Sequence, residues 1–104
     1  MIEAYYKLEN GKITEIEVSG HAEYDESGKD IVCAAVSTAI IVSANAIEML
    51  DLNDNRSLTI EEGYFKIEVL KNNDVLNKLL KNLEYTLYDL EQQYPEYIKN
   101  QKER

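Results

Sequence analysis

Residues 2–20 read IEAYYKLENGKITEIEVSG, and the architecture of the chain is best approached from this run. Apolar and polar residues alternate on both sides of Asn10-Gly11, a dipeptide that strongly favours a two-residue turn between antiparallel strands. Ile13 falls out of phase with the apolar residues that follow it, as expected of a position beside the turn. The run therefore predicts a β-hairpin whose second strand closes at Gly20.

A loop and a long apolar helix are expected to follow the hairpin. Residues 21–30 are polar and show neither the strand nor the helix period, so they predict a loop, which is a candidate for function. Asp30 can cap the next helix, because a short carboxylate accepts hydrogen bonds from the free amides of a first helical turn. That helix is expected from Ile31 to about Leu50 and is apolar nearly all round. Such a helix is usually covered on two sides, here by the sheet and by a second subunit.

The second half of the sequence repeats the order of two strands and a helix. Strands are expected over residues 57–61 and 64–70, joined by the turn residues Glu62-Gly63. A last helix begins after residues 72–74, and leucines spaced three and four apart form its apolar stripe: Leu76, Leu79, Leu80, Leu83, Leu87 and Leu90. Pro95 is expected to end or kink this helix, and the charged tail 99–104 is expected to fray. The order ββαββα predicts an α+β fold, an antiparallel sheet with two helices packed on one face.

Length and composition restrict the class of protein. The 104 residues suffice for a single domain, 1–104. The formal net charge of −9 disfavours nucleic acid as a direct partner and favours a positively charged segment. Polar residues interrupt the apolar run 31–50, so no membrane association is expected, and the N-terminus lacks the pattern of a signal peptide.

The cysteine and histidine content bears on compartment and cofactors. A single cysteine allows no internal disulfide, which suits a reducing cytoplasm. One cysteine and one histidine cannot alone supply the four ligands of a structural zinc site. Neither a metal nor another cofactor is therefore expected.

Cys33 and His21 are the residues that could carry covalent chemistry. Cys33 lies in the first turn of the predicted helix, where the free amides and the helix dipole favour a thiolate. The loop could return His21 to within hydrogen-bond reach of the sulfur, providing a proton acceptor and donor for nucleophilic attack. A buried structural cysteine and a surface loop histidine are the alternatives that spacing leaves open. Phosphatase chemistry is disfavoured, because the position at which an arginine would hold phosphate is Ala39.

Residues 19–37 read SGHAEYDESGKDIVCAAVS, and this run closely resembles the signature of the ribosomal-processing cysteine protease family, Prp. The resemblance rests on a Gly-His-Ala element, a short loop containing glycine, and the run Asp-Ile-Val-Cys-Ala-Ala-Val-Ser. It implies an endopeptidase that removes the N-terminal extension of the twenty-seventh large-subunit ribosomal protein during ribosome biogenesis. In this family pattern Cys33 is the nucleophile and His21 the general base and acid. The resemblance also implies substrates with aromatic residues before the cleaved bond and basic residues after it.

Asp30 and Ser37 occupy motif positions, and each has two candidate roles. Asp30 either orients His21, as the third member of a catalytic triad does, or only caps the helix. If the carboxylate accepts from the amide of Cys33, that amide is not free for an oxyanion. Ser37 lies one turn beyond Cys33 and either supports the thiolate or substrate, or lets the helix pack closely.

The loop 22–29 is expected to act as a lid over the site. The candidate substrate-binding residues are Gly20, Ala22, Tyr24 and Gly28, of which Tyr24 is the candidate for contact with aromatic substrate side chains. The expected partners are the extended ribosomal protein precursor and a second copy of the chain, since the apolar first helix predicts a homodimer. The alternative function is a non-catalytic homodimeric module that binds a ribosomal protein and in which Cys33 is only a packed helix residue.

Overall fold

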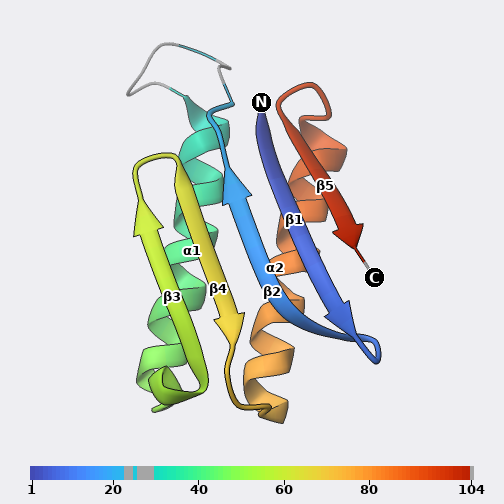
Figure 1. Ribbon diagram of the computed structural model, residues 1–104. Coiled ribbons are helices and arrows are strands. Elements are labelled where there is room, and N and C mark those ends of the chain that lie inside the picture. The colour runs from blue at the N-terminus through green and yellow to red at the C-terminus, as the bar shows by residue number, and fades with distance from the viewer. Residues whose placement is uncertain (23–24, 26–29, 104) are drawn as a thin grey trace.

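The structure of the protein, a computed structural model, describes residues 1–22, 25 and 30–103. The elements follow in the order β1 (Ile2–Glu9), β2 (Lys12–Ser19), α1 (Ile31–Met49), a 3₁₀ turn (Asn53–Asn55), β3 (Arg56–Glu61), β4 (Tyr64–Val69), α2 (Asp74–Gln93) and β5 (Ile98–Glu103). One sheet carries both helices side by side on the same face (Figure 1). The predicted α+β fold with two helices on one face of a sheet is confirmed.

The sheet contains a strand that the sequence analysis did not predict. Its order is β3-β4-β2-β1-β5, and β5 pairs with β1 in parallel, so the sheet is mixed rather than wholly antiparallel. The expectation that the tail 99–104 frays was wrong for its described part. Ile98 is fully buried, and Asn100 donates from its main-chain amide to the carboxylate of Glu91 in α2. The hydroxyl of Tyr6 in β1 also donates to the Asn100 side chain, so polar bonds to both neighbours hold this charged strand in place.

The first hairpin is confirmed, and its irregularity has a visible cause. Asn10 and Gly11 both have positive φ, 53° and 77°, as a two-residue turn of this kind requires. The pairing shifts by one residue between Lys7 and Leu8, which is the signature of a β-bulge. Because of this shift Ile13 lies on the same core face as the apolar residues of β2 that follow it.

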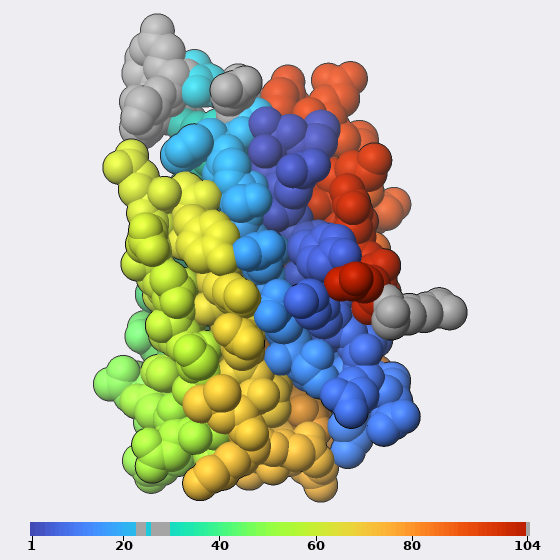
Figure 2. Space-filling model, viewed as in Figure 1, coloured from blue at the N-terminus to red at the C-terminus, as the bar shows by residue number. Residues whose placement is uncertain are grey.

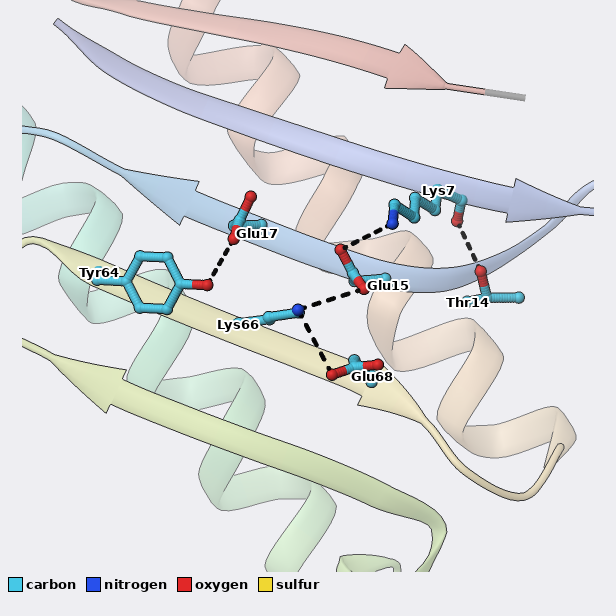
Figure 3. Close-up of polar contacts among 7 residues, drawn as sticks. All are labelled: Lys7, Thr14, Glu15, Glu17, Tyr64, Lys66 and Glu68. Atoms are coloured by element: carbon cyan, nitrogen blue, oxygen red, sulfur yellow. Dashed lines mark hydrogen bonds and ion pairs between the residues drawn. The ribbon is translucent and has the colours of Figure 1, made fainter.

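The face of the sheet opposite the helices is polar, and Figure 2 shows strands from both halves of the chain lying next to one another across it. Glu15 lies at its centre, 8% exposed, between Lys7 and Lys66 at 3.8 and 3.7 Å (Figure 3). Lys66 also pairs with Glu68 at 3.6 Å. Two cations therefore offset the cost of covering this carboxylate.

The two helices contribute to the core in different ways. Four of the six leucines predicted for the stripe of α2 are buried, with no more than 1% exposure at Leu76, Leu80, Leu83 and Leu87, and Leu79 and Leu90 are partly buried against the same core. The buried residues of α1 are Val32, Val36, Ile40 and Ile47. Other apolar residues of α1 face outward, among them Ile41 at 52% and Val42 at 61% exposure. By length and composition α1 could cross a membrane, but in this fold its buried residues share one core with the sheet and α2.

Candidate active site

Cys33 lies in the first turn of α1, whose N-terminus is closed by a side-chain cap. Oδ1 of Asp30 accepts hydrogen bonds from the main-chain amides of Val32 and Cys33, at 2.9 and 3.0 Å. The amide of Ala34 donates to the carbonyl of Asp30 at 3.1 Å. Asp30 is thus the N-cap of α1, and the amide of Cys33 is bound to that cap.

The segment that leaves β2 passes directly over this helix end. Gly20 has a φ of +96°, and its amide donates to the carbonyl of Gly63 at 3.0 Å. A Cβ on Gly20 would collide with the main-chain oxygen of Met1, so no other residue fits without moving the backbone. Two residues further on, the amide of Ala22 donates to Sγ of Cys33 at 3.2 Å. This bond joins the Gly-His-Ala element directly to the cysteine.

The imidazole of His21 lies against Gly63, in the turn between β3 and β4. A Cβ built on Gly63 would be only 2.9 Å from Nε2 of His21, so the ring occupies the space that a side chain at position 63 would fill. His21 and Cys33 line the same pocket. Among the described residues, however, no hydrogen bond joins the imidazole to Sγ.

The pocket that contains these two residues has a volume of about 330 Å³. Its walls come from the start of β1, the end of β2, α1 and the β3–β4 hairpin, and its apolar lining includes Ile2, Val18, Val36, Ile40 and Phe65. Ser37 lies in the wall one turn along α1 from Cys33, and Glu61 and Glu62 add carboxylates from the hairpin. The cavity therefore combines a nucleophile, an imidazole and an apolar surface with acidic groups, a composition suited to binding a peptide.

Comparison with known proteins is consistent with this chemistry. Residues 1–99 match the family described as Cysteine protease Prp. The ribosomal processing cysteine protease Prp of Staphylococcus aureus (strain Mu50) is 36% identical over 99 residues, which cover 88% of each chain. The chain belongs to the Prp cysteine protease family.

Solved structures of the Prp family extend the match to three dimensions. The essential ribosomal processing protease Prp from S. aureus, crystallised with a covalently linked product peptide, superposes with a TM-score of 0.90 at 30% identity. That match covers 99% of this chain and all of the other. The S. aureus protein crystallised with a substrate peptide gives a TM-score of 0.86 at the same identity. This Prp-family chain is accordingly a cysteine protease.

The β3–β4 hairpin is the part of the site that the sequence analysis missed. It brings Gly63 and the two carboxylates at positions 61 and 62 to the pocket. The Glu62-Gly63 turn was visible in the sequence, but its closeness to His21 depends on β4 lying next to β2. Among the candidate substrate-binding residues, Gly20 lines the pocket, whereas Ala22 does not and is only 3% exposed. Tyr24, Gly28 and most of the predicted lid 22–29 lie outside the described residues.

Tyr64 also lines the pocket, but its hydroxyl is engaged elsewhere. The hydroxyl donates to the carboxylate of Glu17 on the open face of the sheet (Figure 3). This hydrogen bond is the main cause that raises the pKa of Tyr64 to about 12, so the phenol is neutral near pH 7. Its ring thus contributes surface rather than a proton. Among the residues that the structure describes, no three His, Cys, Asp or Glu side chains are grouped to hold a metal ion.

Proposed function

We propose that this chain removes the N-terminal extension of the twenty-seventh large-subunit ribosomal protein during ribosome biogenesis, with Cys33 as nucleophile and His21 as general base and acid. The observation that carries the proposal is that Cys33 and His21 line one pocket. They are the only cysteine and the only histidine in the sequence, so a cysteine protease made from this chain has no other thiol or imidazole to use. The name of the S. aureus relative supports ribosomal protein processing as the task.

In the proposed reaction His21 first takes the thiol proton of Cys33. The sulfur lone pair attacks the scissile carbonyl carbon, the C–S bond forms, and the carbonyl π pair becomes an oxyanion. When the oxyanion collapses the C–N bond breaks, and His21 gives its proton to the departing amine. Water then loses a proton to His21, attacks the thioester and releases the new carboxylate with the thiolate. We place the closure of the Cys33–His21 hydrogen bond in the substrate complex, since such bonds often tighten only there.

The lining of the pocket supports the substrate class. Aromatic residues before the cleaved bond would lie against its apolar surface, formed in part by Val36, Ile40 and Phe65. Basic residues after that bond would meet Glu61 and Glu62 at the hairpin. No ion pair joins either glutamate to another described residue, so both carboxylates are available to a substrate cation. The net charge of −9 adds a general attraction for such a segment.

A cleavage assay tests this function directly. The protein is incubated with the extended ribosomal protein of the same genome, and the products are weighed by mass spectrometry. We expect one cut between aromatic and basic residues, no cut with Cys33→Ala, and a loss of about 10²–10⁴-fold with His21→Ala. Iodoacetamide should also alkylate Cys33, and more slowly in His21→Ala. Undiminished cleavage by the Cys33→Ala protein would exclude the proposed mechanism.

We also propose that the enzyme is a homodimer formed through α1. The support is the largely apolar outer surface of this helix, on which Ile31, Ile41, Val42 and Met49 are each more than half exposed, at 51%, 52%, 61% and 82%. Glu48 is the one charged residue of α1. Val42→Lys should then shift the sedimentation coefficient from that of a dimer to that of a monomer. Val75→Lys is the matched control, because Val75 is a 48% exposed valine on the other helix. Equal sedimentation of both variants with the parent protein would exclude this interface.

We place the enzyme in the cytoplasm, where ribosomes are assembled and thiols stay reduced. The proposed nucleophile has no second cysteine with which to form an internal disulfide. Fractionation of cells that express the chain from its native locus tests this placement, which recovery of the protein mainly outside the cytoplasm would contradict.

A further inference from the structure

Three main-chain amides at the N-terminus of α1 already have acceptors. Those of Val32 and Cys33 donate to the side chain of Asp30, and that of Ala34 donates to its carbonyl. While the cap stays closed, none of these three amides is free to donate to the oxyanion of a tetrahedral intermediate.

One main-chain amide already points at the reacting atom. The N–H of Ala22 donates to Sγ of Cys33 at 3.2 Å, and it is the only polar group that bonds to the sulfur among the described residues. Ala22 is 3% exposed, so water competes little for this amide. A hydrogen bond to a thiolate is charge-assisted and stronger than one to a neutral thiol. The contact therefore favours the form of the cysteine that attacks.

The chain around Ala22 is held so that the amide keeps this direction. Gly20, two residues earlier, is fixed by its bond to the carbonyl of Gly63 and by close contact with the main chain of Met1. Ala22 itself packs in the core with its methyl group. The N–H is thus preorganised between a fixed turn and the capped end of α1, as an electrostatic catalyst needs to be.

We propose that the main-chain N–H of Ala22 is a catalytic group that binds the Cys33 thiolate before attack and the oxyanion afterwards. This inference rests on the function proposed above. As the C–S bond forms, the sulfur loses its negative charge, and the carbonyl π pair places that charge on an oxygen two bonds away from the sulfur. The sulfur thus becomes a weaker hydrogen-bond acceptor and the oxygen a stronger one, and the N–H of Ala22 moves its hydrogen bond from the sulfur to the oxygen. No proton leaves the amide at any step, so the bond is remade when the thiolate is released.

Replacement of a single atom tests the proposal. Cys33 is the only cysteine, so a synthetic segment 1–32 can be ligated to residues 33–104 with no other change. In that segment L-lactic acid replaces Ala22, which converts the amide to an ester and removes the N–H donor while keeping the methyl side chain. The matched control carries the same replacement at Ala4, a 1% exposed alanine of β1 that does not line the pocket.

We expect the Ala22 ester to lower kcat by about 10²–10³-fold, as loss of one oxyanion donor does, with little change in KM. Binding of a peptide aldehyde, which forms a tetrahedral adduct with Cys33, should weaken in parallel. Alkylation by iodoacetamide, which creates no oxyanion, should slow by less than about tenfold. The Ala4 ester should keep kcat within about threefold of the parent protein, since it touches no reacting atom.

Equal kcat in the two ester proteins would overturn the role of the Ala22 amide while leaving the function intact. A parent protein that still cleaves after complete alkylation of Cys33 would instead overturn the proposed function. The pair Ala22→Gly and Ala22→Pro gives a second measurement, because glycine keeps the N–H and proline lacks it. Ala22→Gly should retain most of the activity that Ala22→Pro loses, and equal activity of the two would count against the proposal.

Discussion

The two helices of this protein begin with the same kind of cap but differ in which of their first residues are buried. Asp30 caps α1 and Asn73 caps α2, and each accepts from the second and third amides of its helix at 2.9 and 3.0 Å. In α1 the second residue, Val32, is fully buried and the third, Cys33, reaches the pocket. In α2 the second residue, Val75, is 48% exposed and the third, Leu76, is fully buried.

This difference shows how a small domain separates stability from chemistry. The residue that points into the core comes one position later after the cap in α2 than in α1. The third residue of α2 is therefore a buried leucine, whereas the third residue of α1 is a partly exposed cysteine. The amphipathic α2 has one face to bury, and the core is built around it. The apolar α1 buries only Val32, Val36, Ile40 and Ile47, which leaves its third residue, Cys33, for the pocket.

The largest expected effect comes from removing the thiol at the third position of α1. Cys33→Ala should abolish cleavage, a loss of about 10⁴-fold or more, because the nucleophile is gone. The unfolding free energy should change by less than about 1 kcal/mol, since the deleted atom is small and only partly buried. Peptide cleavage and urea unfolding measure the two quantities. Destabilisation without loss of turnover would make Cys33 a packing residue.

The corresponding change in α2 should have the opposite result. Leu76→Ala should lower the unfolding free energy by about 2–5 kcal/mol, because a fully buried leucine leaves a cavity. The folded fraction should keep the kcat of the parent protein, since Leu76 does not line the pocket. Urea titration and active-site titration check these outcomes together. A marked fall in kcat per folded molecule would show that the roles of the two helices are not separate.

A change in the β3–β4 turn tests what holds His21. Gly63→Ala combines the strain of a φ of +70° with a methyl group 2.9 Å from Nε2, so the imidazole must move. We expect kcat/KM to fall about tenfold or more, with a stability cost of about 1 kcal/mol. Gly11→Ala is the matched control, because its φ is +77° and nothing lies within 4 Å of the new methyl group. If both variants lost activity equally, backbone strain rather than the imidazole would be responsible.

The sequence predicted most of this fold for identifiable reasons. The Asn10-Gly11 turn and the leucine stripe of α2 are local patterns with a regular period, and both were found where expected. Strand β5 could not be predicted in that way, because Ile98 is the one buried residue in a strand of otherwise polar side chains. Its place depends on the distant partners Tyr6 and Glu91, which no local pattern reveals.

The residues of the candidate site could be named from the sequence only in part. The motif that contains His21 and Cys33 is contiguous, and a helix start is readable from Asp30, so these residues could be named from the sequence. The contributions of Gly63, Glu61 and Glu62 arise from strand order, which brings β4 beside β2. The direction of the Ala22 amide depends on the backbone geometry at Gly20, which the pattern of side chains in the sequence does not reveal.

The substitution Tyr6→Phe tests the polar contacts on the α2 side of the core. Its ring stacks on Tyr88 of α2, and its hydroxyl donates to Asn100. Burial is the largest cause that raises the pKa of Tyr6 above its ordinary value of 10.0. Because the folded state holds this proton more tightly, the resulting stability is complete below about pH 10 and is lost as the pH rises further.

Tyr6→Phe should lower the free energy of unfolding by about 1–2 kcal/mol near pH 7, and this difference from the parent protein should shrink above about pH 10. Urea unfolding at both pH values measures it, and a difference that does not shrink would contradict the assignment.

The smallest expected effect is the most direct test of the two caps, an exchange of their side chains. Asp30→Asn keeps the acceptor oxygen but removes a negative charge at a helix end that has no other acidic residue in its first turn. It should cost about 0.3–1 kcal/mol. Asn73→Asp adds a charge to a helix that already has Asp74 in its first turn, so it should gain less than this.

The activity of these two variants separates capping from catalysis. If Asp30 acts through the cap alone, Asp30→Asn keeps kcat/KM within about threefold, and we expect this result because its Oδ1 already accepts two amides. A fall of about 10²-fold or more at nearly unchanged stability would instead show that the carboxylate orients or neutralises His21, because asparagine caps a helix but carries no charge. Asn73→Asp should leave kcat/KM unaltered in either case, since the N-terminus of α2 does not line the pocket.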